Sequence, residues 1–593
     1  MKRADAGFWI GAGALAAGTL AARAAIWLLP ATGGDVARAR ELGIVSVSIL
    51  AGHSKSAESL AYAVGMAVAL AVGLGIWAVW ARPREPWVAL PRGPKLTWLE
   101  LLAVTALFAL LFARPWTARS SWANPFMLFS EEGEALAWVN TVLRGEVLSR
   151  DTFCLYGPLA TWPTSWLFRV AGPSLGLWRI WVFALDALAL VATYWLVREL
   201  LRTRAGALAA TLVVGLLCAP ALPAMSWCLA RVGLGLAALA ALTRGRPGVS
   251  GALLAITLGF SQEVGVACAA GAGAALLAAR EPWRVWARLT VGAAAVLLPI
   301  GVYLGAVGAL SATLDNLFVF PRTRLLGFGA LPFPALEPTA ESLRAWFAPA
   351  LLVVAGFVAG TKLLRGARDP RTRSELALAV FGALLFSGAL SRPDDTHLAF
   401  AAPPVLILLA GLLEEAALGL TTPAWRVACA AGALAGTLAL APWTSVALAN
   451  AQSLWPATPT GYRVLDVARG GGASMPAEIA LHLETITHVL QARVRPDEPF
   501  LAFPNEALLY FLADRPQPTR FPMAILAVTR EQRQQLVADL ERTRPHYAAV
   551  YRYADPVDAI GYRKAIPEVM SYLDATYEFE ESFGAFELWR RKD

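Results

Sequence analysis

The sequence predicts a multi-pass α-helical membrane protein of about 13 transmembrane helices with a small C-terminal α/β domain. Of its 593 residues, 57% are hydrophobic and 16% are charged, whereas soluble domains carry about 25% charged residues. Apolar runs recur up to about residue 449, and each is long enough to cross a hydrocarbon layer about 30 Å thick as a helix. After Asn450 the composition becomes that of an ordinary globular domain.

The apolar runs divide the chain into three parts. Residues 1–97 hold two additional N-terminal helices and a basic loop, residues 98–449 hold the transmembrane core, and residues 450–593 form the soluble domain. The two runs that meet near Ser261 are short for full spans, so a re-entrant hairpin is an open alternative there. The predicted spans are 8–29, 59–80, 98–114, 177–197, 206–223, 228–243, 249–262, 264–279, 289–309, 346–364, 376–390, 398–418 and 427–449.

The basic residues predict the orientation of these spans. Five arginine- and lysine-rich loops alternate onto one side of the membrane, which the positive-inside bias assigns to the cytoplasm. Arg322, Arg324 and Arg344 fall on the opposite side and dilute the bias without reversing it. An odd number of spans places the N-terminus in the cytoplasm and the soluble domain outside it. The net charge of +8 therefore belongs to short membrane loops and predicts no nucleic-acid partner.

The C-terminal domain shows helix and strand patterns in alternation. Thr529 with Gln532 has the spacing of a capping box, which predicts a helix beginning there and running to about Arg542. The other expected elements are a helix over 476–493, a strand over 499–503, a helix over 506–513 and a strand over 547–551.

The loop over 117–176 is long for a connection between two helices, and long loops on a compact bundle often carry function. It contains the acidic pair Glu131 and Glu132, and later Asp151. A carboxylate within reach of an acceptor hydroxyl can serve as a general base. The simpler structural interpretation is a solvated amphipathic helix with Glu134 facing water.

This loop resembles the first external loop of GT-C glycosyltransferases of the protein mannosyltransferase and aminoarabinose transferase type, the family 39-like enzymes. The resemblance implies that Glu131 or Glu132 is the catalytic base, with Asp151 as a second candidate. Many relatives carry Asp-Glu or Asp-Asp where this chain has Glu-Glu, so the role is assigned to the pair. The strings that carry the resemblance are Phe129-Ser130-Glu131-Glu132-Gly133, Arg144-Gly145-Glu146, Arg150-Asp151-Thr152-Phe153 and Tyr156-Gly157-Pro158-Leu159.

The resemblance also implies an activity and a location. It implies an inverting transferase that moves a hexose or pentose from a polyprenyl-phosphate donor to a lipid, glycan or protein acceptor. The enzyme would work in contact with membrane lipids, on the outer face of a bacterial inner membrane. A phosphate leaves as an anion, so this transfer needs a stabilising cation rather than a second acid.

Several side chains on the same predicted face are candidates for that cation and its surroundings. Arginine suits bidentate contact with phosphate. Arg392 lies in a tight Arg-Pro-Asp-Asp-Thr-His turn, and its pairing with a neighbouring Asp to cap the turn is an equally open interpretation. Glu263 stands where relatives often place a basic residue. The candidates for donor phosphate are Arg231, Arg392 and His397, and the further pocket candidates are Glu263, Asp394, Asp395 and Tyr156.

No metal site or certain cofactor is predicted. The five cysteines form no CxxC pair, although an acidic pair could coordinate a divalent cation. Asp186, within a span, is expected to make a structural pairing. Two other classes of protein stay open: a transporter or flippase of a lipid-linked or anionic substrate, and a non-catalytic partner that keeps the GT-C fold.

Overall fold

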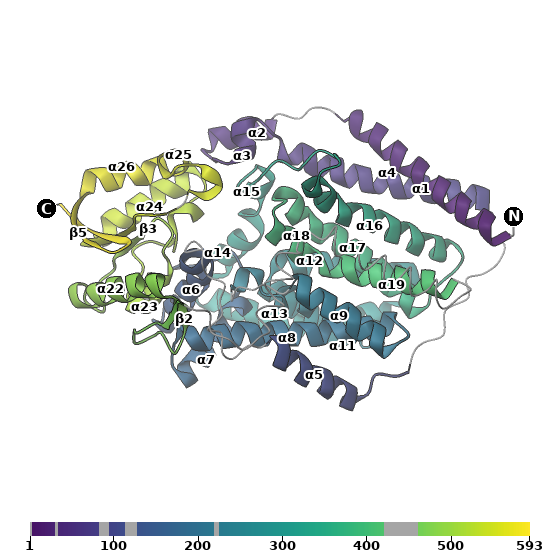
Figure 1. Cartoon of the computed structure of the whole chain (residues 1–593), viewed down its shortest axis with the longest axis horizontal. Helices are drawn as coiled ribbons and strands as arrows, with labels where there is room; N and C mark the ends of the chain where they lie inside the picture. The colour runs from purple at the N-terminus through teal and green to yellow at the C-terminus, as the bar shows by residue number, and fades with distance from the viewer. Residues whose placement is uncertain are drawn as a thin grey trace.

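The computed structural model describes residues 3–29, 34–81, 94–112, 127–218, 224–419, 461–554 and 556–592. It contains a bundle of helices and an α/β domain near the C-terminus. Figure 1 shows this domain at one end of the bundle, beside α6 and α7. The predicted span 427–449 and the predicted boundary at residue 450 lie outside the described residues.

Eight helices in the described parts of the chain are long and apolar enough to cross a membrane. Their positions agree with the predicted runs, because a lipid-exposed backbone must satisfy its own hydrogen bonds. They are α1 (Arg3–Trp27), α4 (Lys55–Ala81), α8 (Leu175–Leu200), α10 (Ala230–Thr243, with the turn η3 at Met225–Trp227), α12 (Gln262–Ala279), α13 (Trp283–Ala306), α16 (Ala340–Leu364) and α17 (Pro370–Ser391).

Three further apolar helices are shorter. They are α5 (Trp98–Phe112), α9 (Arg204–Cys218) and α11 (Pro247–Phe260). With 14 residues, α11 is about 21 Å long, and Ser261 alone separates it from α12.

The predicted span over 398–418 corresponds to two helices that meet at a bend. α18 (Asp395–Ala401) and α19 (Pro403–Gly419) meet at a bend of 56°. Two consecutive prolines, Pro403 and Pro404, begin α19, and proline cannot continue the hydrogen bonding of a preceding helix. Counted as one broken span, this pair raises the number of candidate spans to nine in the described chain.

Short helices connect the long ones at the end of the bundle that carries the terminal domain. Two of them, η1 and η4, are π-helices, a form that often occurs at functional sites. The connecting elements are α2 (Gly34–Glu41), α3 (Val47–Ala51), η1 (Met127–Glu132), α6 (Gly133–Leu143), η2 (Pro158–Ala160), α7 (Trp162–Ala171), α14 (Leu310–Leu314), η4 (Asp315–Val319) and α15 (Arg322–Leu325).

Helix α10 forms the centre of the bundle, packed against α8, α11, α12 and α17. Small residues allow this close packing, as is typical of membrane helices. A side chain at Gly233 would collide with Ala189 of α8, and one at Gly251 of α11 would meet the carbonyl group of Leu289 in α13. The site described below is therefore built on a tightly packed scaffold.

The terminal domain has a four-stranded sheet in the order β3-β4-β6-β5, with β3 and β4 parallel and the other pairs antiparallel. The parallel pair requires a crossover, which α24 provides. The predicted capping box is present, with Thr529 and Gln532 bonding reciprocally. The elements are β1 (Tyr462–Val464), β2 (Ser474–Pro476), α22 (Ala477–Arg493), β3 (Leu501–Phe503), α23 (Leu508–Ala513), η5 (Ala524–Leu526), α24 (Arg530–Thr543), β4 (Tyr547–Tyr551), η6 (Val557–Ala559), α25 (Tyr562–Ala565), α26 (Pro567–Thr576), β5 (Tyr577–Phe583) and β6 (Phe586–Arg591).

The interpretation of the 117–176 loop as a solvated helix is wrong. All residues of α6 from Gly133 to Thr141 are buried, including Glu134. The reason is that α23 of the terminal domain covers α6: a side chain at Gly133 would collide with the backbone of Leu508. The Asn140 amide also donates to the carbonyl oxygen of Tyr510 at 3.2 Å. The terminal domain thus packs directly on the loop that carries the acidic pair.

Candidate functional site

The segment that carries Glu131 is anchored on both sides. Before it, the Phe129 ring packs edge-on against Tyr551 of the terminal sheet, with ring centroids 5.1 Å apart. After it, Glu132 accepts two hydrogen bonds of 2.9 Å from Arg179 of α8, and both side chains are fully buried. These contacts direct Phe129 and Glu132 into protein, while Glu131 lines a cavity.

This cavity, which we call the domain-side cavity, lies between the bundle and the terminal domain and has a volume of about 290 Å³. The bundle and its connecting loops supply most of its polar groups, and the terminal domain supplies a largely apolar wall. Its charged and polar side chains are Ser46, Ser130, Glu131, Glu134, Tyr156, Ser226, Trp227, Arg324, Arg392, Asp394, Thr396, His397, Asp558 and Tyr562.

Glu131 has the environment of a tuned base. Burial raises the pKa of its carboxyl group, and this outweighs the lowering by the nearby polar groups of Ser226 and Trp227 and by the charges of Arg324 and Arg392. A raised pKa makes the carboxylate a stronger proton acceptor once it is ionised.

A second cavity, which we call the bundle cavity, has a volume of about 440 Å³ and lies among α12, α17 and η4. Most of its wall is apolar, from Val266 and Ala267 of α12 to Leu384 and Leu385 of α17. The two cavities share a wall. The residues that line both are Leu155, Tyr156, Trp227, Arg324 and His397.

Arg231 lines the bundle cavity, but its guanidinium group is buried and already engaged. It pairs with Glu263 and donates to the carbonyl oxygen of Ser226. It also lies over the rings of Tyr156 and Phe400, at 4.5 and 4.3 Å from their centroids. The acidic residue at position 263 therefore neutralises Arg231.

Arg392 is held by two carboxylates. Its Nε donates to Asp394 at 2.7 Å, and its two terminal nitrogens donate to Asp558 of the terminal domain at 2.7 and 2.6 Å. Asp394 also accepts from the backbone N–H and the Nδ1–H of His397, at 3.0 and 2.8 Å. Burial raises the pKa of Asp394, yet the bonds with His397 and the charge of Arg392 lower it more, so its net pKa is lowered. The turn is thus a structured charge network that reaches the terminal domain.

Asp151 and Asp395 line neither cavity. Asp151 is bound by Arg150 through two hydrogen bonds of 2.8 Å, which lower the pKa of its carboxyl group. Asp395 lies 3.7 Å from Arg344. Glu132 is likewise absent from both cavity walls. Of the acidic candidates for the base, Glu131 is the one that reaches a cavity.

Arg324 of α15 and Glu134 of α6 enter the site although the sequence did not mark them as candidates. The Arg324 side chain is exposed and lines both cavities. Within the described chain, no ion pair or hydrogen bond holds its guanidinium group. A signal for it existed in the sequence: it is a cation on the predicted external side, against the positive-inside bias.

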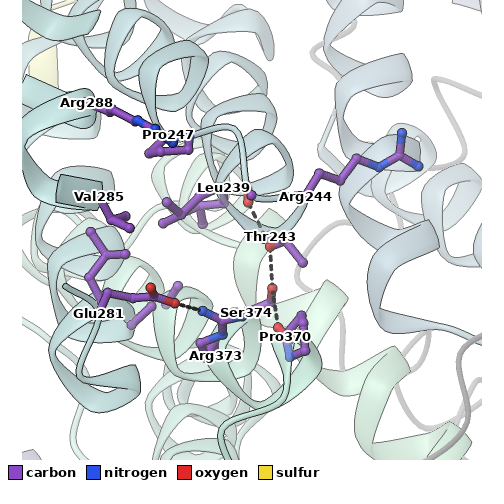
Figure 2. Close-up of a pocket in the computed structure, with 15 residues that line it drawn as sticks. Leu239, Thr243, Arg244, Pro247, Glu281, Val285, Arg288, Pro370, Arg373 and Ser374 are labelled. Carbon is purple, nitrogen blue, oxygen red and sulfur yellow. Dashed lines mark hydrogen bonds and ion pairs between the residues drawn. The ribbon is translucent and has the colours of Figure 1, made fainter. Parts of the chain in front are cut away.

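A third cavity, of about 340 Å³, lies at the other end of the bundle. It surrounds Thr243, the last residue of α10 and 12 positions after Arg231, which places it about 18 Å further along that helix. Figure 2 shows Arg373 paired with Glu281 there, and Thr243 facing Ser374. The hydroxyl oxygens of Thr243 and Ser374 are 2.7 Å apart. Its polar groups thus largely engage one another.

No group of three or more His, Cys, Asp or Glu side chains is arranged to hold a metal ion in the part of the chain that the structure describes. Asp186 accepts hydrogen bonds from the backbone N–H of Leu229, at 2.6 Å, and from the Cys228 thiol, at 3.2 Å. It therefore fixes the start of α10, which is a structural pairing of the kind that was expected.

No family model matches the sequence, and no curated protein sequence matches it significantly. Among solved structures, the chain is similar to ArnT from Cupriavidus metallidurans bound to undecaprenyl phosphate, with 15% identity, a TM-score of 0.46, and coverage of 83% of this chain and 97% of that one. It is also similar to the oligosaccharyltransferase AglB from Archaeoglobus fulgidus in complex with an inhibitory peptide and a dolichol-phosphate, with 13% identity, a TM-score of 0.45, and coverage of 84% and 75%.

Both neighbours are GT-C superfamily glycosyltransferases, the superfamily that the first loop of this chain resembles. At these identities and TM-scores, the chemistry of the site has to be argued from this chain's own residues.

Proposed function

We propose that this protein transfers a sugar from a polyprenyl-phosphate donor to an acceptor hydroxyl, with Glu131 as the general base. The single observation that carries the proposal is the wall shared by the two cavities. Glu131 faces the domain-side cavity, and Arg324 lines both cavities. The candidate base Glu131 and the cation Arg324 thus line the same cavity, and Arg324 also reaches the second one.

The two cavities differ in polarity, as would be needed for a lipid-linked donor and an acceptor that carries a hydroxyl group. The largely apolar bundle cavity suits the isoprenoid chain of the donor, because burying apolar surface is favourable. Arg324 would bind the donor phosphate. The domain-side cavity would hold the acceptor, with the terminal domain forming its outer wall.

The chemistry then needs one proton transfer. Glu131 accepts the proton of the acceptor hydroxyl while the oxygen of that hydroxyl attacks the anomeric carbon of the sugar. The bond between that carbon and the phosphate oxygen breaks, and polyprenyl phosphate leaves as an anion stabilised by Arg324. Attack opposite the leaving group inverts the anomeric configuration. We place this face of the protein outside the cytoplasm of a bacterium, as the loop charges predict.

A transfer assay tests the proposal. The purified protein in lipid nanodiscs is incubated with radiolabelled polyprenyl-phosphate hexoses and pentoses and with lipid, glycan and peptide acceptors. Wild-type protein should label an acceptor, and Glu131→Gln should reduce the rate by roughly 100- to 10,000-fold. Asp151→Asn, at a carboxylate outside both cavities, is the matched control and should retain activity. Full activity of Glu131→Gln, or no transfer by wild type from any donor, would refute the proposal.

A further inference from the structure

Glu134 is a wall residue of the domain-side cavity and has a buried carboxyl oxygen. The residue is only 4% exposed, and its Oε1 atom has no hydrogen-bond partner among the described residues. Leaving a buried polar atom unpaired is unfavourable, because the atom has lost its hydrogen bonds to water. Since Glu134 belongs to the cavity wall, a molecule in the cavity is the natural partner of this oxygen.

The surroundings of Glu134 favour a neutral carboxylic acid. Burial raises the pKa of this carboxyl group well above its ordinary value, and the negative charge of Glu131 raises it further.

The two glutamates are positioned to contact one ligand. They are three residues apart on consecutive helical turns, so their side chains lie on the same side of the segment. Both line the same cavity. The charges that act on them differ. Glu131 has the positive charges of Arg324 and Arg392 nearby, whereas Glu134 has the negative charge of Glu131 nearby.

We infer that Glu134 is a specificity-determining residue: as a neutral carboxylic acid it donates a hydrogen bond to an uncharged oxygen of the acceptor, beside the hydroxyl that Glu131 deprotonates. This inference rests on the proposed function and narrows the acceptor to an uncharged, hydroxyl-rich compound such as a glycan. An anionic group at this position would lie close to the ionised carboxylate of Glu131. A protonated carboxyl group both donates and accepts, so it matches a sugar hydroxyl.

Two substitutions of Glu134 separate this role from that of a base. Glutamine is neutral and keeps a donor group and an acceptor, so Glu134→Gln should lower kcat/KM for the acceptor only about threefold. Leucine removes both hydrogen-bonding functions, so Glu134→Leu should lower that kcat/KM by roughly 10- to 100-fold, with the KM for donor unchanged. A loss in Glu134→Gln as large as that in Glu131→Gln would overturn the inference, because Glu134 would then act as a base.

A second measurement does not depend on turnover. Infrared difference spectra, recorded over a series of pH values with and without octyl glucoside as a probe acceptor, should show a carboxylic-acid C=O band that shifts on binding. The band should be absent in Glu134→Gln and present in Asp151→Asn. No such band, or a band that the probe does not move, would overturn the role of Glu134 whether or not the protein transfers sugar. Failure of transfer with the band intact would count against the proposed function alone.

Discussion

Glu131 and Glu132 are adjacent, and the same substitution by glutamine is expected to have opposite effects at the two positions. Glu131 is half-buried and faces the domain-side cavity. Glu132 is completely buried and binds Arg179 through two hydrogen bonds of 2.9 Å. Glu131→Gln should therefore abolish the catalytic base and leave the fold intact. Glu132→Gln should leave the buried guanidinium group of Arg179 without its carboxylate partner.

The magnitude follows from the burial of that pair. Both partners have side chains that are 0% exposed, and removing one partner of a buried ion pair destabilises a protein by about 3–5 kcal/mol. Arg179 also donates to the carbonyl oxygen of Ser474 in the terminal domain, at 3.0 Å. Loss of the pair should therefore also loosen the contact between that domain and α8.

The assay compares the Tm of each purified variant in detergent with its transfer rate. Glu132→Gln should lower the Tm clearly, while Glu131→Gln should keep the wild-type Tm and lose transfer by roughly 100- to 10,000-fold. Replacing both members of the buried pair, with Glu132→Leu and Arg179→Met together, should restore part of the lost stability. A wild-type Tm in Glu132→Gln together with a low Tm in Glu131→Gln would refute this division of roles.

Further predictions concern the pH profile, the donor phosphate, the terminal domain and the packing of the loop. Because the base must be ionised and the pKa of Glu131 is raised, kcat/KM should fall as the pH drops through a value above the ordinary glutamate pKa of 4.5; an acid limb below that value would contradict the assignment. Arg324→Ala should raise the KM for donor with the Tm unchanged, and Arg324→Lys should recover part of the affinity; equal KM values in all three proteins would exclude phosphate binding there. Asp558→Asn should weaken the ion pair between the terminal domain and Arg392, so limited proteolysis should cleave the terminal domain faster than in wild type. The control is Asp497→Asn, at an exposed carboxylate of the same domain, which should not change the cleavage rate. Gly157→Ala should lower the Tm because its new methyl group would collide with the carbonyl group of Gly259. Gly145→Ala is the comparison: no atom lies near its new methyl group, so any fall in its Tm reflects only the strain of a positive φ.

The helical pattern could be predicted because lipid forces each span to satisfy its own backbone, which leaves long apolar runs in the sequence. The α/β signals of the terminal domain were equally local, as the Thr529 capping box shows. The bend between α18 and α19 was missed because hydropathy averages over the Pro403–Pro404 break. The burial of α6 was missed because the covering helix α23 lies more than 350 residues further along the chain.

The candidate site could be predicted only as a set of residues on one face. Periodicity cannot separate Glu131 from Glu132, because the π-helical turn at η1 and the partner Arg179 decide which carboxylate meets a cavity. Arg231 and Arg392 were reasonable candidates by residue type, but their neutralisation by Glu263 and Asp558 depends on contacts between distant segments. Arg324 was interpreted as an exception to a charge bias, and its position between two cavities is a property of the fold.

The central claim, that one site joins a polyprenyl-phosphate sugar to an acceptor hydroxyl, is tested most directly by measuring both products of a single turnover. Wild-type protein loaded with a doubly labelled donor should release polyprenyl phosphate and form glycosylated acceptor in equal amounts, and Glu131→Gln should bind the donor and form neither. Donor that crosses the bilayer of a proteoliposome with its sugar still attached, and with no acceptor labelled, would contradict the account and favour a flippase.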